Sequence, residues 1–289
     1  MDLLGELREE IARIVREHPG NRHPQGDGPY FEEPLVGLAS ARDPLFERYK
    51  EVVGPFHLTP SELFEDAFGR GSLGRGTVIC WVLPIDRETR STNRGEDRLP
   101  SARWARTRDL GERFNNALRR GVVGFLQGRG HRAVAPMLSG LWRRVDEGPV
   151  GLASTWSERH AAYAAGLGTF SLNDGLITPR GIAHRLGSVV TDAVLPPSAR
   201  PYPDHRANCL FFRGEECGEC IRRCPAGAVS EAGHDKARCA RYTYGVALAA
   251  VGERYGVEVS GCGLCQTGVP CEGAIPAAGA GREAPGAGG

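Results

Sequence analysis

The sequence lacks the features that mark membrane and secreted proteins. No apolar run approaches the roughly 20 residues that a membrane-spanning helix needs, so no membrane partner is expected. Residues 1–20 are charged and amphipathic and contain no apolar stretch of about seven residues, which a secretory signal requires. These absences predict a cytoplasmic protein whose thiols stay reduced.

A surplus of charge of one sign is also missing. The 36 Lys and Arg residues nearly balance the 35 Asp and Glu residues, and the formal net charge is +1. Composition therefore does not support tRNA or another nucleic acid as a partner, and it leaves the substrate unknown.

The basic residues are nevertheless unevenly distributed, because many arginines lie in one third of the chain. They are Arg103, Arg106, Arg108, Arg113, Arg119, Arg120, Arg129, Arg132, Arg143 and Arg144. Such a run is typical of solvated helix faces, or of a face for an anionic substrate or an acidic electron-donor protein. The sequence alone leaves both interpretations open.

Cysteine is present in a pattern that carries chemistry. Eight of the nine cysteines are Cys209, Cys217, Cys220, Cys224, Cys239, Cys262, Cys265 and Cys271. A [4Fe–4S] cluster takes four thiolates, and in the bacterial pattern C-x2-C-x2-C-x3-C-P the fourth cysteine ligates the other cluster. Because Cys220, Cys224 and Pro225 match the end of this pattern, the sequence predicts two [4Fe–4S] clusters that carry single electrons.

The spacing also predicts which thiols share a cluster. Gly214 stands where the compact pattern has its first cysteine, so Cys209 is expected to replace that ligand through a longer loop. Crossed ligation then assigns Cys209, Cys217, Cys220 and Cys271 to one cluster, and Cys224, Cys239, Cys262 and Cys265 to the other.

Zinc and disulfides are the alternatives to this assignment. Two C-x2-C pairs can form a four-thiolate zinc site, but eight thiols and the Cys-Pro ending favour iron–sulfur clusters. Disulfides are disfavoured by the expected cytoplasmic location. Cys80 lies apart, in an apolar segment, and is interpreted as a small core residue.

Periodicity predicts alternating helices and strands in the first two thirds of the chain. Helices are expected from Leu3 to just before Pro19, over 60–68 after a Thr59 capping box, over 102–126, and from a second capping box at Thr155 to Gly166. Strands are expected over 77–83, 132–137 and 186–192, and a surface loop over 84–100. Residues 69–74 match G-x-G-x-x-G formally, but they follow a helix and precede a strand, so a dinucleotide site is rejected.

These elements predict an α/β (α+β) cofactor-binding domain over 1–204. A bacterial-ferredoxin-like domain with two [4Fe–4S] clusters is expected over 205–276. The remaining residues, 277–289, are rich in Gly, Ala and Pro and are predicted to be a disordered tail.

Three segments together resemble the epoxyqueuosine reductase family: 158–168 (ERHAAYAAGLG), 177–181 (ITPRG) and 186–192 (LGSVVTD). The resemblance covers about 77–276. Members join an α/β corrinoid-binding domain to a two-cluster ferredoxin domain and are similar in architecture to reductive dehalogenases. The resemblance implies a reductase that passes electrons from a small ferredoxin- or flavodoxin-type donor, through the clusters, to a cobalamin. It places cofactor contacts at Gly166, Leu167, Gly168, Gly187 and Ser188.

The chain departs from that family in two ways. The family has a catalytic aspartate shortly before the helix that ends in Gly-Leu-Gly, whereas residues 152–154 here are Leu, Ala and Ser. The candidates for its role are Asp146, Tyr163 and His160, the last because a histidine has a pKa suited to proton donation. The helical-repeat extension that some members carry after the clusters is also absent, and queuosine chemistry is therefore in doubt.

The leading hypothesis is an epoxyqueuosine reductase-like iron–sulfur oxidoreductase that acts on a small or nucleoside-type substrate. A ferredoxin-like electron carrier or maturation partner without its own substrate is the alternative. An RNA-binding protein with structural clusters would rest on the arginine-rich segment alone.

Overall fold

The computed structural model describes residues 2–24, 26 and 28–279. It divides into two compact units, each built from discontinuous segments of the chain. Unit 1 consists of Met1–Leu83, Gly111–Leu167 and Arg185–Pro201, and unit 2 of Pro84–Leu110, Gly168–His184 and Tyr202–Gly289. The predicted boundary at residue 204 stays a prediction, and the predicted tail lies outside the described residues from 280 onward.

Unit 1 is built around a sheet of strand order β1-β2-β8-β3. Its strands are β1 (Leu35–Ser40), β2 (Thr77–Pro84), β3 (Ala133–Val134) and β8 (His184–Thr191), and a separate hairpin is formed by β4 (Arg144–Gly148) and β5 (Gly151–Ser154). Its helices are α1 (Leu3–Glu17), α2 (Leu45–Val52), α3 (Pro60–Phe68), α6 (Glu158–Ala164) and the short 3-10 turn η1 (Pro136–Leu138). β1 pairs antiparallel with β2, and β3 with β8, so the fold is α+β.

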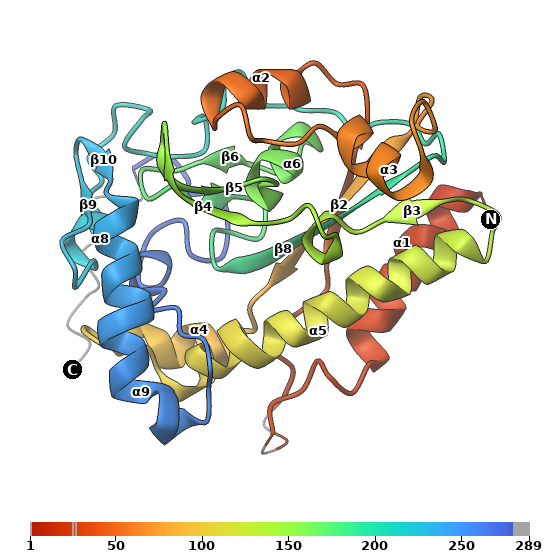
Figure 1. Cartoon of the computed structure of the whole chain (residues 1–289). Helices are drawn as coiled ribbons and strands as arrows, with labels where there is room; N and C mark the ends of the chain where they lie inside the picture. The colour runs from red at the N-terminus through yellow and green to blue at the C-terminus, as the bar shows by residue number, and fades with distance from the viewer. Residues whose placement is uncertain (1, 25, 27, 280–289) are drawn as a thin grey trace. The chain divides into compact units, whose positions relative to one another are not determined.

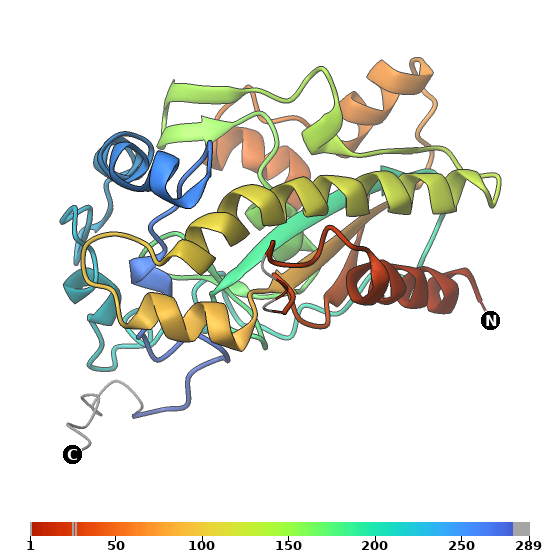
Figure 2. The same ribbon diagram turned by 90° about the horizontal axis from the view of Figure 1, so that it is seen from below.

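Helices cover both faces of this sheet. Figures 1 and 2 show α1 and the later part of α5 (Ala102–Gln127) on one side, and α2, α3 and α6 on the other. Every residue of β2 is buried, as expected for a strand covered on both faces. Cys80 lies in this strand and is 1% exposed, so its interpretation as a core residue is confirmed.

Buried polar groups link α5 to the sheet in unit 1. The Trp81 indole N–H donates to Asn115 Oδ1 at 2.9 Å, and Asn115 donates to the Leu186 carbonyl. Arg119 is 1% exposed and pairs with Glu112 at 2.7 Å and with Glu158 at 3.1 Å. Two carboxylates balance this buried guanidinium, so at least one arginine of the arginine-rich segment has a structural role.

Unit 2 contains short elements joined by loops. Its helices are α4 (Arg87–Arg94), the start of α5, α7 (Glu219–Arg222), α8 (Lys236–Ala240), the π-helical segment η2 (Arg241–Ala247), α9 (Leu248–Tyr255) and the 3-10 turn η3 (Leu264–Gln266). Two hairpins complete it, β6 (Thr169–Phe170) with β7 (Leu176–Ile177), and β9 (Val229–Ser230) with β10 (Gly233–His234).

The structure corrects three local predictions. The segment 84–100, predicted as a loop, contains α4, capped by Asp86. The helix predicted from Thr155 begins at Glu158, with Ser157 as its N-cap residue, and Glu158 contacts Arg119 instead of completing a capping box. The strand predicted over 132–137 is shorter, because Pro136 opens a 3-10 turn.

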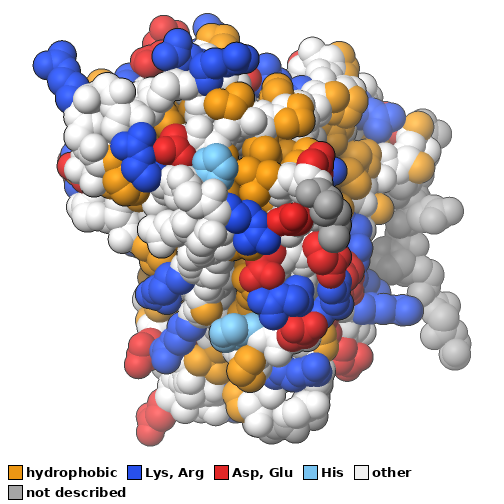
Figure 3. All heavy atoms as spheres, turned by 90° about the vertical axis from the view of Figure 1, so that its right-hand side faces the viewer, with side chains coloured by type: hydrophobic (Ala, Val, Ile, Leu, Met, Phe, Trp, Pro, Cys, Tyr) orange, Lys and Arg blue, Asp and Glu red, His pale blue; other side chains and the backbone are white. Residues whose placement is uncertain are grey.

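Charges of both signs are mixed on the surface that Figure 3 shows, where blue and red side chains are interspersed. Ion pairs account for further arginines of the segment 103–144: Arg129 pairs with Glu6 at 2.6 Å, and Arg132 with Asp192 at 2.9 Å. Within the described residues, no helix combines the length and the apolar character needed to cross a bilayer.

Candidate functional site

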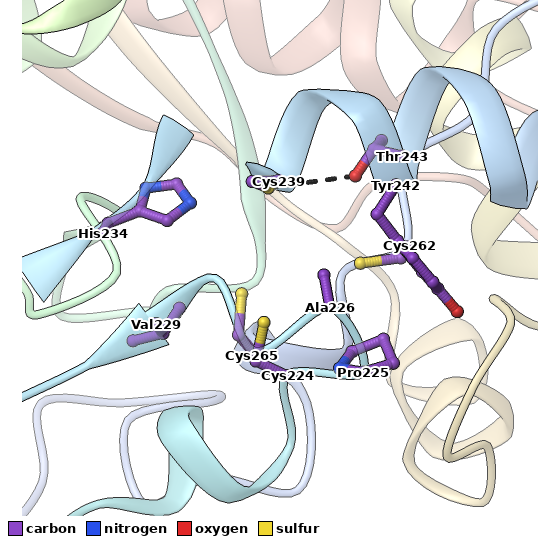
Figure 4. Close-up of a pocket in the computed structure, with 10 residues that line it drawn as sticks. All are labelled: Cys224, Pro225, Ala226, Val229, His234, Cys239, Tyr242, Thr243, Cys262 and Cys265. Carbon is purple, nitrogen blue, oxygen red and sulfur yellow. Dashed lines mark hydrogen bonds between the residues drawn. The ribbon is translucent and has the colours of Figure 1, made fainter. Parts of the chain in front are cut away.

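Two cysteine-lined cavities lie within unit 2. The first cavity is lined by Cys224, Pro225, Ala226, Val229, His234, Cys239, Tyr242, Thr243, Cys262 and Cys265. Figure 4 shows the thiols of Cys224, Cys262 and Cys265 directed into a common space, which Cys239 approaches from α8. Thr243, in the π-helical segment, lies one turn beyond Cys239, with Oγ1 3.9 Å from its sulfur.

The second cavity is also lined by four cysteines. Its lining residues include Cys209, Cys217, Cys220 and Cys271, together with Ser171, Leu172, Asn173, Ile177, Glu219 and apolar side chains. Cys209 is 7% exposed and belongs to the apolar cluster around this cavity. Gly214 has a φ of +75° and is a turn residue in a left-handed conformation.

The eight thiols therefore fall into the two groups that the spacing predicted. Cys220 lines the second cavity and Cys224 the first, although only three residues separate them. Cys271, the last cysteine, lines the same cavity as Cys209, the first of the eight. The role of these cysteines as metal ligands remains a prediction.

The thiols of both cavities would be poor thiolates on their own. Burial, reinforced by the neighbouring thiols, raises the pKa of Cys220 to about 12 and raises the pKa of Cys271 as well. Burial is also the main cause that raises the pKa of Cys262 and Cys265 in the first cavity. Four thiolates in one cavity therefore require a cationic partner, which a metal centre supplies.

The thiols are distributed around the two cavities. Among the described residues, no three His, Cys, Asp or Glu side chains are grouped so that they can hold one metal ion. In a [4Fe–4S] cluster each thiolate binds a different iron, so thiols distributed around a cavity fit the donor set of a cluster.

Residues that sequence reasoning missed fix the loops carrying the cysteines. The Asn93 side chain is fully buried and donates to Thr267 Oγ1 at 3.1 Å and to the Cys262 carbonyl at 3.2 Å. Arg223 donates to the carbonyls of Leu264 and Thr267 at 3.2 and 2.9 Å.

The loop before Cys271 is held in a second way. Arg94, at the end of α4, pairs with the buried carboxylate of Glu272 at 2.6 Å, and Glu272 accepts from the Gly268 backbone N–H at 2.7 Å. The helix that the sequence did not predict thus contacts the chain at both ends of the segment from Cys262 to Cys271.

The three predicted catalytic residues lie in unit 1, and the structure does not gather them into one cavity. His160 Nδ1 is 2.8 Å from the Ser157 hydroxyl, and its ring packs edge-on against Tyr49 at 4.8 Å. Tyr163 is half-buried on the same helix, α6. Asp146 is exposed on the β4–β5 hairpin and pairs with Arg144 at 2.5 Å.

The positions predicted to contact a cofactor in unit 1 are filled by the protein itself. A Cβ added at Gly166 would lie 2.1 Å from the Ala199 carbonyl oxygen, and one at Gly187 would lie 2.4 Å from the Trp81 ring. Ser188 is fully buried and accepts from the Trp156 indole at 3.0 Å, and Leu167 is 7% exposed. The packing of unit 1 therefore explains these residues without a cofactor.

Gly168 belongs to unit 2 and is equally enclosed. A Cβ there would lie 2.4 Å from the Ile177 carbonyl oxygen, since Thr169 pairs with Ile177 in the β6–β7 hairpin. The cofactor role of all five positions remains a prediction, and protein atoms pack closely around each of them.

By sequence, the chain matches no protein-family model and no curated protein. By structure, it resembles a selenomethionine-labelled epoxyqueuosine reductase, with a TM-score of 0.52 at 19% identity over 93% of this chain and 66% of that one. The enzyme from Streptococcus thermophilus gives a TM-score of 0.51 at 14% identity, over 96% and 68%. The chain thus spans about two thirds of the length of these proteins.

A third solved structure corrects the inference from composition. An epoxyqueuosine reductase in complex with an epoxyqueuosine-modified tRNA stem loop matches with a TM-score of 0.50 at 19% identity, over 93% of this chain and 65% of that one. From composition, tRNA was not supported as a partner and the substrate was unknown. That inference is corrected, because a nearly neutral net charge does not exclude a local tRNA-binding face. Across both of its units, the chain has an epoxyqueuosine reductase-like fold.

Proposed function

We propose that this chain is an iron–sulfur oxidoreductase that acts on a tRNA-borne nucleoside and holds two [4Fe–4S] clusters in unit 2. The observation that carries the proposal is the division of eight thiols into two sets of four, each around its own cavity. When bound, the clusters supply one-electron transfer.

The protein's part is to hold and insulate the clusters. The Ala228 backbone N–H donates to Cys224 Sγ at 3.2 Å, a contact that stabilises the thiolate form. Cys220 lies in the single turn of α7, and Cys224 follows two residues after that turn ends. One short piece of backbone therefore connects the two cavities. Electrons supplied by a small ferredoxin- or flavodoxin-type protein therefore have a short covalent path from one cluster to the other.

The proposed substrate rests on the fold. An epoxyqueuosine reductase with the same fold carries a tRNA stem loop, which supports a substrate presented on tRNA. No step of this proposal depends on a corrinoid, because Gly166 and Gly187 are enclosed by the protein's own atoms.

Metal analysis of anaerobically purified protein tests the clusters. Iron and sulfide should each approach about eight per chain, the content of two [4Fe–4S] clusters. About four irons per chain, or zinc in their place, would overturn the two-cluster assignment.

Binding of tRNA stem loops tests the substrate. The modified stem loop should bind more tightly than its unmodified counterpart, and affinity should fall steeply between 50 and 200 mM salt, as phosphate contacts require. Reduction of the bound nucleoside by the reconstituted protein with a chemical donor would establish the activity.

The ferredoxin-like carrier is the second candidate, and the enclosure of the five predicted cofactor positions favours it. Visible spectra of the reconstituted protein with added cobalamin separate the two. A shift toward the base-off form supports the reductase with a corrinoid. If no cobalamin binds at micromolar concentration and tRNA does not bind, the carrier function accounts better for the chain.

A further inference from the structure

We propose that His234, oriented by Asp174, is a positioning residue that makes the cluster in the first cavity the more readily reduced of the two. The inference rests on the proposed function, because it requires both clusters. It concerns the order in which they take up electrons, one electron for each cluster.

His234 lies directly against a ligand of the first cavity. It lines that cavity together with Cys239. In Figure 4 the ring extends from β10 toward Cys239. A thiolate bound to iron has no proton to give, so in a hydrogen bond between these two side chains the imidazole is the donor.

Asp174 holds the ring from the other side. Its carboxylate lies 3.2 Å from His234 Nδ1 and 3.7 Å from Lys236 Nζ. Asp174 has a φ of +60° and is the one non-glycine residue in the left-handed region among those the structure describes. Such a conformation persists only where surrounding contacts fix it, and aspartate is among the residues that tolerate it best.

Those contacts come from the turn between β6 and β7. Asn173 donates to the Cys265 carbonyl at 2.7 Å, and its Oδ1 accepts from the Gly175 N–H at 2.9 Å. Asn173 also lines the second cavity. The same turn therefore forms part of the wall of one cavity and orients the hydrogen-bond donor of the other.

The two cavities differ in the charged groups that line them. The first has His234, which together with Lys236 lies against the Asp174 carboxylate, and the second has Glu219, which pairs with Arg222. Because each of these charges has a partner of opposite sign, the difference between the cavities is the imidazole donor, and a hydrogen bond to a thiolate stabilises the reduced, more negative cluster. The geometry therefore assigns the more positive reduction potential to the first cavity.

A reductive titration of reconstituted full-length protein, followed by EPR, tests the assignment. Wild-type protein should show two one-electron steps, and Cys217→Ser should identify the step of the second cavity. His234→Phe should lower the ratio of reduced to oxidised first cluster about tenfold at a fixed potential, a shift of about 59 mV for one electron. The second step should not move.

Two further variants make the result specific. His234→Gln keeps a side-chain N–H donor and should restore most of the potential. His205→Phe makes the same chemical change at an exposed histidine that lines neither cavity, and it should leave both steps unchanged. Equal midpoints in wild type and His234→Phe, with both clusters present, would overturn the inference and leave the proposed function standing.

A measurement on wild-type protein does not depend on any variant folding. With ¹⁵N-labelled histidine, pulsed EPR should detect a nitrogen coupling on the more positive signal and none on the other. A coupling on neither signal, or on the more negative one, would refute the assignment. Failure to bind iron and sulfide at all would instead refute the proposed function.

Discussion

At the scale of single residues, His57 links stability to pH. It is 1% exposed, and its Nε2 accepts from the Ser157 backbone N–H at 3.2 Å, at the start of α6. Burial lowers the pKa of His57 from its ordinary value of 6.5 to about 4. Between pH 6.5 and about 4, His57 is protonated in the unfolded chain but not in the folded protein. The free energy of unfolding is therefore highest above pH 6.5 and falls as the pH drops toward 4.

The size of this effect can be measured against a variant that does not titrate. From pH 7.5 to 5.5, wild-type protein should lose about 1 kcal/mol more unfolding free energy than His57→Gln, which keeps an acceptor for Ser157. Urea unfolding followed by tryptophan fluorescence gives both values. Equal losses of unfolding free energy in the two proteins would mean that folding does not lower the pKa of His57.

Gly187 distinguishes packing from cofactor binding. Because a Cβ there would lie 2.4 Å from the buried Trp81 ring, Gly187→Ala should destabilise the protein by about 1–3 kcal/mol whether or not cobalamin is present. Gly140→Ala is the matched control, since nothing lies within 4 Å of its added Cβ. A normal melting temperature for Gly187→Ala, combined with lost cobalamin binding, would favour the cofactor role instead.

At the scale of elements, α4 ties the helical part of unit 2 to the cysteine loops. Asn93→Ala removes the donor to the Cys262 carbonyl and the acceptor for the Ser101 N–H, each of which costs about 1–3 kcal/mol when buried and unpaired. The variant should release iron from the first cavity faster than wild type when a chelator is added. Glu88→Ala, at an exposed position on the same helix, should release iron at the wild-type rate.

The elements that the sequence predicts well are those with local signals. The Thr59 capping box predicts the start of α3 correctly, because Thr59 and Glu62 satisfy each other's backbone N–H groups without help from the rest of the fold. In α4 the buried residues are Thr89 and Asn93, and the Asn93 side chain donates to Thr267, which lies far away in sequence. A helix that buries polar side chains carries no apolar stripe, so the pattern of residues 84–100 resembles a loop.

The candidate site, too, could be predicted from the sequence only in part. The grouping of the thiols follows from the spacing of Cys220, Cys224 and Pro225, since one helical turn directs two neighbouring cysteines to different cavities. The roles of Arg223 and His234 could not be predicted, because each depends on contacts with distant segments. The glycines at 166 and 187 carry an ambiguous signal, since packing and cofactor approach both require a residue without a side chain.

At the scale of the whole molecule, the crossed arrangement makes the ends of the cysteine-rich segment depend on each other. Cys209 and Cys271 line one cavity, while Cys239, between them in sequence, lines the other. Cys209→Ser and Cys271→Ser should therefore diminish the same EPR signal or convert it to that of a three-iron cluster. The double variant should lose no more iron than one cluster contains, because both residues are expected to bind the same cluster.

Combining cysteines from different cavities should give the opposite result. Cys209→Ser with Cys239→Ser should affect both signals, and the losses of iron should add, because the two thiols serve separate clusters. Cys80→Ser is the control, since this thiol is buried in β2 of unit 1 and should leave both clusters intact. If Cys209→Ser and Cys239→Ser instead diminished one common signal, the two cavities would not correspond to two clusters.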